Sequence, residues 1–256
     1  MGDSSSAAFA TGASESKYYL SDRAYCCEFD DGAIILDMGA VTYLGIDAKH
    51  LPNLRVWVAN WPNSSQRELP ATCSGNAAFT ELIADLLARG LLTTTPIKAH
   101  SLQLECPTKV LAHTEWATTP PRIPVGHILH FCTALLSVLL RRRAGRLASL
   151  LRWIRRHQTS IQGDRPSLSE ETGSDLLGSF FRLRIWFYTA YRHCLLDSLV
   201  LSVFLTKQMV PCALVIGVST KPFAAHAWVQ IDEYVLNDTV EHVQTFTPIL
   251  EVGDLS

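Results

Sequence analysis

The sequence predicts a mixed α+β protein in which a small strand-rich module precedes a larger mixed domain. Short segments of alternating apolar and polar residues near the N-terminus are typical of strands joined by tight turns. Apolar residues spaced three and four apart follow, which is typical of helices that face a core. Near the C-terminus an apolar helical segment is followed by strand-like runs, which predicts a helix packed on an antiparallel sheet.

Three short strands are expected between residues 24 and 44. Residues 24–29 alternate in polarity and lead into Asp31-Gly32, a dipeptide that favours a two-residue hairpin turn. The chain continues through an apolar run at 34–36, turns near Gly39 and resumes at 41–44. Consecutive strands with short connections predict a three-stranded meander.

Helices are expected after the meander. Residues 79–87 carry an apolar stripe that ends before Gly90, a residue suited to the position after a helix. The stripe consists of Phe79, Leu82, Ile83, Leu86 and Leu87. An earlier segment with Leu54, Val56, Trp57 and Trp61 predicts a shorter helix.

Composition divides the chain into four segments. Residues 1–17 are rich in Ser, Ala and Gly without apolar periodicity, which predicts a disordered tail. Residues 18–95 form the first module, and the proline-rich segment 96–125 has no sustained period and predicts a linker. Residues 126–256 form the second domain.

The second domain begins with an apolar segment at 128–140 that is followed by arginines. Thirteen residues are too few for a simple membrane span, which needs about 20, so we expect a buried helix, with an interfacial helix as the alternative. The arginines continue through 141–156. Such a basic helix can contact an acidic partner or an anionic membrane surface, or it can be only a solvated face.

Cys194 begins an apolar helical pattern that runs to Phe204. At a helix N-terminus the unpaired N–H groups favour an anion, so the thiolate, which is the nucleophilic form, is favoured there. A cysteine in this position is on its own more often an inert core residue.

Two strand-like runs follow the helix and contain His226 and Asp238. His226, Trp228 and Gln230 share one face of the first run, and the returning strand is expected at 234–238. If the connecting loop has an odd number of residues, His226 and Asp238 lie on the same face, whereas a two-residue loop sends them to opposite faces. We predict the odd loop.

These residues resemble the protease part of lasso-peptide biosynthesis B proteins, a branch of the transglutaminase-like and papain-like cysteine enzymes. The resemblance rests on Cys194-Leu195, the run LVIGV ending at Val218, Pro222-Phe223, the segment 225–229, the segment 235–238 and Phe246 before Pro248-Ile249. The spacings of 32 residues from Cys194 to His226 and 12 from His226 to Asp238 are similar to those of the family.

The resemblance implies a catalytic triad at three positions. Cys194 would attack a peptide carbonyl, His226 would take and return the proton, and Asp238 would orient the imidazole. The N–H of Cys194 is expected to donate to the oxyanion. Asn237 is an alternative orienting residue, but the strand parity favours Asp238.

The resemblance also implies that the first module is a winged-helix-like domain that recognises a precursor peptide. A leader peptide would add as a strand to the sheet edge and place apolar side chains against the last helix. The corresponding residues here are Val41 and Tyr43 on the third strand and Phe79, Ile83 and Leu87 on the helix. The alternative for each apolar residue is that it belongs to the core.

The function implied is that of a leader peptidase in lasso-peptide biosynthesis, which hydrolyses the bond between leader and core. Its partners would be the lasso precursor and a separate ATP-dependent cyclase of the asparagine-synthetase type. Two alternatives stay open, a transglutaminase-like acyl transferase and a non-catalytic precursor-binding scaffold for the cyclase.

Composition limits the other function classes. The net charge of −2 gives no argument for nucleic acid, and no phosphate-binding loop occurs. Seven cysteines without paired spacing argue against a disulfide framework, so together with the lack of a secretory signal pattern we expect a cytoplasmic protein without stable membrane insertion. His127-x-x-His130 is a weak metal motif, and we expect no metal or other cofactor.

Overall fold

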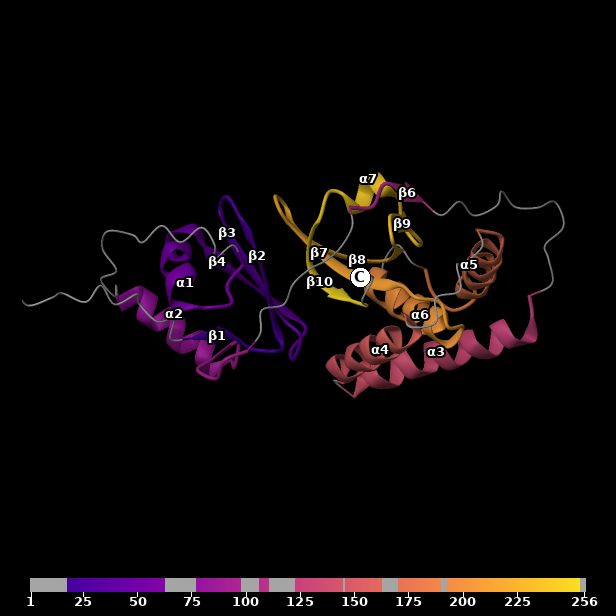
Figure 1. Ribbon diagram of the computed structural model, residues 1–256, viewed down its shortest axis with the longest axis horizontal. Coiled ribbons are helices and arrows are strands. Elements are labelled where there is room, and N and C mark those ends of the chain that lie inside the picture. Colours follow the sequence, from indigo (N-terminus) through magenta and orange to yellow (C-terminus); the bar gives the residue numbers. More distant parts are fainter. Residues whose placement is uncertain are drawn as a thin grey trace, which may run out of the picture. The chain divides into compact units, whose positions relative to one another are not determined.

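The computed structural model shows an α+β protein and describes residues 18–62, 77–97, 106–110, 123–144, 146–162, 170–189 and 193–253 (Figure 1). The predicted tail at 1–17 lies outside the described residues. The chain divides into two compact units, one comprising Met1–Ile35 and Leu44–His100 and the other Leu36–Tyr43 and Ser101–Ser256.

A three-stranded sheet lies in the N-terminal part, with β2 (Ala24–Phe29), β3 (Gly32–Asp37) and β4 (Thr42–Asp47) in sequence order. The predicted meander is therefore confirmed. Gly32 is required at its first turn, because a Cβ there would lie 2.2 Å from the carbonyl oxygen of Ile46. Val41 was predicted to begin the third strand, but it precedes β4 and has a left-handed φ of 57°.

Two helices pack on this sheet as predicted. A single 3-10 turn (Ala48–His50) leads into α1 (Leu51–Trp57), and α2 (Ala77–Ala88) ends two residues before Gly90. Short strands β1 (Tyr19–Leu20) and β5 (Leu92–Thr93) form an antiparallel pair that the sequence did not reveal. The core of this unit includes Ile35, Leu54, Trp61 and Leu86, each almost fully buried.

The C-terminal unit contains a five-stranded sheet in the order β10-β7-β8-β9-β6. Its strands are β6 (Lys109–Val110), β7 (Ala213–Thr220), β8 (Phe223–Ile231), β9 (Tyr234–Val235) and β10 (Thr247–Val252). β6 runs parallel to β9, and the other pairs are antiparallel. Because β6 falls inside the segment predicted to be a linker, residues 109–110 belong structurally to this sheet.

The central helix of this unit is α6 (Cys194–Lys207), which contacts β8 as well as α3 (Val125–Arg143) and α4 (Leu147–Gln162). α5 (Glu170–Arg184) precedes it, and the short α7 (Val240–Val243) follows β9. The sequence suggested one core-facing stripe on α6, but every residue from Leu196 to Thr206 is buried. A helix covered on all sides holds its N-terminus firmly in place.

α3 differs from its prediction. It has 19 residues and is by length and composition apolar enough to cross a membrane. Only 22% of its most apolar 18-residue stretch is buried inside the protein. The expected buried helix is therefore buried on one face only. One face of α3 packs inside the unit and another carries exposed apolar residues.

Candidate active site

Cys194 is the first residue of α6, as predicted. The residue before it, His193, makes no side-chain capping bond, so its side chain does not compete for the N–H groups of the first turn. A hydrogen bond with His226 is the main cause that lowers the pKa of the Cys194 thiol. Burial opposes the shift, while the backbone N–H groups of Ala227 and Leu195 support it.

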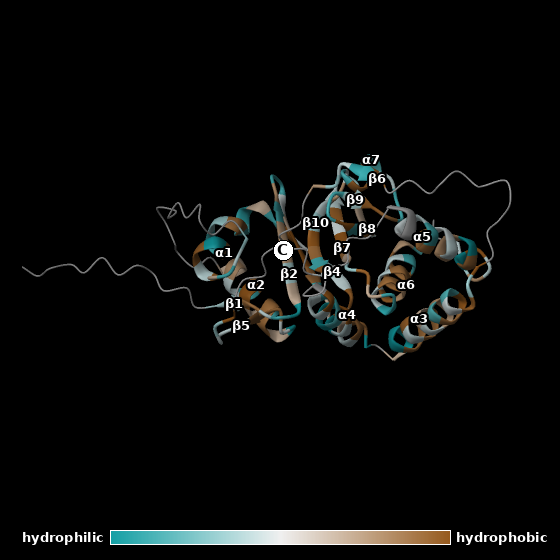
Figure 2. Ribbon diagram, turned by 45° about the vertical axis from the view of Figure 1, so that its right-hand side comes forward, coloured by the Kyte–Doolittle hydropathy of each residue, from teal (hydrophilic) through white to brown (hydrophobic). Residues whose placement is uncertain are grey.

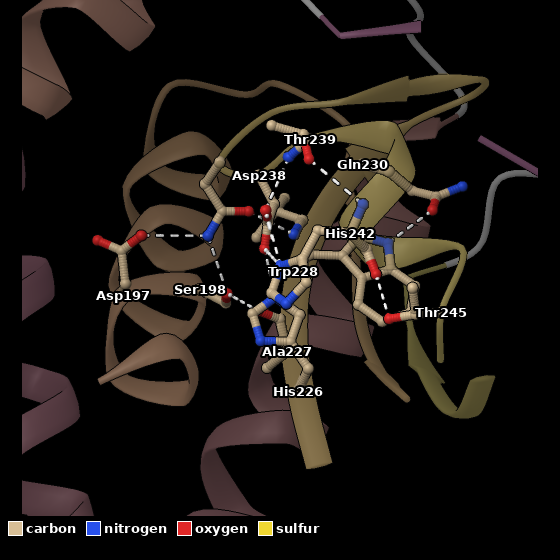
Figure 3. Close-up of polar contacts among 12 residues, drawn as sticks. Asp197, Ser198, His226, Ala227, Trp228, Gln230, Asp238, Thr239, His242 and Thr245 are labelled. Carbon is tan, nitrogen blue, oxygen red and sulfur yellow. Dashed lines mark hydrogen bonds and ion pairs between the residues drawn. The ribbon is translucent and has the colours of Figure 1, made fainter. Parts of the chain in front are cut away.

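His226 lies on β8, and its Nε2 donates to Asp238 Oδ2 at 2.5 Å (Figure 3). Burial disfavours the charged imidazole, but the hydrogen bonds and charges of Asp238 and Cys194 outweigh it and raise the pKa of His226 to about 9. Because Nε2 is engaged by the carboxylate, Nδ1 is the ring nitrogen left for the thiol.

Asp238 is held from three sides. Besides His226, the Thr239 N–H donates to Oδ1 at 2.7 Å, and His242 Nδ1 lies 3.0 Å from Oδ1 and 2.9 Å from Oδ2. Burial alone would raise the pKa of Asp238, but the bonds from His226, Thr239 and His242 lower it to about 2. The carboxylate therefore stays ionised across the physiological range.

The contact between His226 and Asp238 arises by a route different from the one predicted. Gln230 pairs with Val235 and Ile231 with Tyr234, so the connecting turn has two residues, Asp232 and Glu233, and the predicted odd loop is wrong. In this register a continued strand would point the two side chains to opposite faces. Strand pairing instead ends after Val235, and the bend that follows turns the Asp238 carboxylate back toward His226.

A buried polar network connects the nucleophile helix to the histidine strand. The Asn237 side chain accepts from the Val229 N–H at 2.8 Å and donates to Asp197 Oδ2 at 3.1 Å and to Ser198 Oγ at 2.9 Å. Ser198 in turn donates to the carbonyl of Ala227 at 2.9 Å (Figure 3). The network fixes the spacing between α6 and β8, and so the spacing between Cys194 and His226.

An ion pair completes this network. Asp197 is 1% exposed, and Arg184 Nη1 of α5 lies 2.7 Å from its Oδ2. A buried carboxylate needs such a partner because leaving it unpaired would cost several kcal/mol, roughly 3–5. Asp197, Arg184 and the structural role of Asn237 were not predicted from the sequence, since each depends on a partner distant in sequence.

Aromatic rings confine the imidazole of His226. The ring of Phe246 stacks on it at 5.2 Å between centroids, and Trp228 on the same strand face lies at 6.2 Å. Gly217, opposite His226 in the neighbouring strand, makes room for these rings. A Cβ at Gly217 would lie 2.8 Å from both Trp228 and Phe246, so only glycine fits there.

Among the described residues, His226, Asp238 and His242 could together hold a metal ion, because their ligand atoms all lie within 4.8 Å of one another. Two of the three are the proposed base and its orienting acid. A metal bound there would occupy both groups and block proton transfer. The weak motif at His127 has a structural contact instead, since its Nδ1 lies 2.9 Å from Ser179 Oγ.

Residues 134–251 match the family model of the transglutaminase-like superfamily. The chain contains a transglutaminase-like domain. The match includes α6, β7, β8, β9 and most of β10, and it supports a cysteine-protease or acyl-transferase type of activity. No curated protein and no solved structure matches the chain significantly.

The arrangement in the transglutaminase-like domain suits nucleophilic catalysis. A thiol with a lowered pKa beside an imidazole with a raised pKa favours a thiolate–imidazolium pair near neutral pH. The thiolate can attack an acyl carbon, and the imidazolium can protonate the leaving group.

The five predicted leader-binding residues fall into two groups. Phe79 and Ile83 are 7% and 6% exposed and belong to the core of the N-terminal unit, as the core alternative expected. Leu87 and Val41 are 36% and 38% exposed, and Tyr43 is partly exposed on β4. Only the second group offers accessible apolar surface.

Proposed function

We propose that this chain is a leader peptidase of lasso-peptide biosynthesis that binds a ribosomal precursor and hydrolyses the peptide bond between leader and core. The observation that carries the proposal is the contact of His226 with Asp238 beside the thiol of Cys194, within a transglutaminase-like domain. The lasso assignment adds the resemblance of the segments around these residues to the B proteins.

In the proposed reaction the Cys194 thiolate attacks the carbonyl carbon at the end of the leader. The N–H of Cys194 stabilises the oxyanion, and His226 gives its proton to the amine of the core as the C–N bond breaks. The leader is then a thioester on Cys194. His226 removes a proton from water, the hydroxide attacks the thioester, and the leader leaves with a free carboxylate while the thiol is restored.

Leader binding is proposed for the N-terminal unit, which we take to be the winged-helix-like recognition module. β4 is an edge strand of its three-stranded sheet, and five of its six residues are exposed or partly exposed while Ile46 is buried. An open edge offers backbone hydrogen bonds to an added strand. Within this unit Leu87 would contact its side chains, and for Val41 and Tyr43, which the division of the chain assigns to the other unit, leader binding stays a prediction.

The freed core would be closed by a separate ATP-dependent cyclase of the asparagine-synthetase type, in the bacterial cytoplasm. The sequence has no phosphate-binding loop of the G-x-x-x-x-G-K-[ST] type, which is why ATP use is assigned to the partner.

The test is a cleavage assay on the precursor peptide encoded beside the gene, with mass analysis of the products. We expect a leader with a free carboxylate and an intact core, and loss of this reaction in Cys194→Ala. Cys106→Ala is the matched control, because Cys106 is an exposed, unpaired cysteine outside the site.

Other products would point elsewhere. If the leader appears as an amide of an added amine, the chain is an acyl transferase, since an amine can resolve the same thioester. If Cys194→Ala removes the leader as fast as the wild type in the presence of the cyclase, the chain is a binding scaffold.

A further inference from the structure

The outer face of α3 carries a continuous apolar stripe. Its side chains are 39% to 80% exposed and recur at intervals of three and four residues: Val125, Ile128, Leu129, Leu136, Leu139 and Leu140. Cys132 is exposed in the same row. The opposite face, with Phe131, Ala134 and Val138, is fully buried. At 1.5 Å per residue the stripe from Val125 to Leu140 is about 24 Å long, and a single apolar patch of this extent marks an interaction surface.

Positive charge follows the C-terminal end of this stripe in the sequence. Arg143 follows Val125 by 18 residues, which is five helical turns, so it lies in line with the stripe. Arg142, Arg146, Arg152 and Arg156 are also exposed. From 123 to 162 the sequence has seven arginines and no Asp or Glu, although the whole chain has a net charge of −2.

A second apolar element lies against the same helix. The turn after α5 exposes Ile185 by 65%, Trp186 by 82% and Phe187 by 55%. The ring of Phe187 lies 5.4 Å from that of Phe131, which places this turn beside the N-terminal half of α3. Exposed tryptophan next to aliphatic residues is typical of surfaces that contact the membrane interface.

We propose that α3 is a peripheral membrane-binding element that lays its apolar stripe on an anionic lipid surface, with the arginines contacting the head groups. Charge complementarity identifies the occupant, since exposed aliphatic side chains on a segment with seven arginines and no acidic residue of its own fit the interface of an anionic bilayer. Figure 2 shows the apolar residues along this helix.

Two other occupants fit the same face less well. A protein partner needs hydrogen-bonding groups to fix its orientation, and the stripe itself presents none apart from one thiol. A transmembrane span would require lipid around the whole helix, but Phe131, Ala134 and Val138 pack inside the unit. Surface binding is the mode that leaves the fold intact.

The experiment is flotation of the full chain with vesicles of phosphatidylcholine alone or mixed in equal parts with phosphatidylglycerol. We expect binding to the mixed vesicles, weakened by salt, and little binding to the neutral ones. Leu129→Gln with Leu136→Gln removes two apolar contacts and should lower the vesicle affinity roughly a hundredfold, because each exposed leucine contributes roughly one order of magnitude. Arg142→Glu with Arg143→Glu should abolish the preference for anionic lipid.

Met209→Gln is the matched control, since Met209 is 57% exposed outside the stripe and should not alter flotation. Thermal unfolding of each variant checks that the fold is kept. Absence of wild-type flotation, equal binding to both vesicles, or resistance to both high salt and alkaline extraction would overturn the proposal. Concentration-dependent dimerisation that the leucine variant abolishes, without vesicle binding, would replace it with a second copy of this chain as the occupant.

Discussion

His242 Nδ1 lies 2.9 Å from Asp238 Oδ2, the same carboxylate oxygen that accepts the hydrogen bond of His226. Asp238 is therefore shared by two imidazoles, one buried beside the thiol and one half exposed on α7. The second imidazole restricts the rotation of the carboxylate, which in turn orients the first.

Loss of the hydrogen bond between His242 and Asp238 is expected to slow peptide-bond cleavage moderately. His242→Ala should lower kcat roughly tenfold with little change in KM, because a hydrogen bond to a carboxylate is lost while the triad remains. His242→Asn should restore part of the rate, since its amide N–H can take the place of Nδ1. An unchanged kcat in His242→Ala, with His157→Ala as the exposed-histidine control, would contradict a positioning role.

The pH profile of Cys194 reactivity should be bell-shaped. The thiolate–imidazolium pair exists above the lowered pKa of Cys194 and below the pKa of His226, which is about 9. Asp238→Asn removes the charge that raises the pKa of His226, so the alkaline limb should move to lower pH. The measurement is kcat/KM for peptide-bond cleavage as a function of pH, because cleavage needs the imidazolium to protonate the leaving group, and an alkaline limb that stays in place in this variant would argue against the assigned orienting role.

The network at Asn237 predicts a charge-dependent loss of stability. Asn237→Asp places a second carboxylate beside buried Asp197 and should lower the free energy of unfolding by about 3 kcal/mol. Combination with Asp197→Asn leaves one carboxylate near Arg184 and should recover most of this loss. Denaturant unfolding measures both, and a double variant no more stable than the single one would show that like-charge repulsion is not the cause.

Gly217→Ala is expected to disturb the ring contacts of His226. The added Cβ would press against Trp228 and Phe246 at 2.8 Å, so we expect a loss of about 1–3 kcal/mol in stability and lower activity. Gly178→Ala on α5 is the matched control, because nothing lies within 4 Å of the added Cβ and alanine favours the helix. Equal effects of the two substitutions would show that close packing at Gly217 is unimportant.

Zinc should inhibit the enzyme reversibly. Zn²⁺ binding to His226, Asp238 and His242 would occupy the base and its orienting acid, and a chelator should restore activity. His242→Ala removes one ligand and should weaken the inhibition. Equal sensitivity of wild type and variant would place the zinc elsewhere, for example on the thiol.

Local patterns in the sequence were sufficient for much of this fold. The meander follows from alternation and from Asp31-Gly32, and α2 follows from a stripe that ends near Gly90, because both structures depend on residues adjacent in the chain. The position of Cys194 at a helix start was also predictable, since it depends on one short segment, whereas the contact of His226 with Asp238 was predicted from an odd loop that the structure does not have.

Only the tertiary structure decided how these parts meet. The two-residue turn, the bend at Asp238 and the contact of His242 depend on where strand pairing stops, which no periodicity encodes. The Asn237 network and the burial of α6 on all sides arise from partners far away in the sequence. The sequence shows that the segment of α3 is apolar. Whether these apolar residues face the core or the solvent depends on which helices cover them, which is decided by packing.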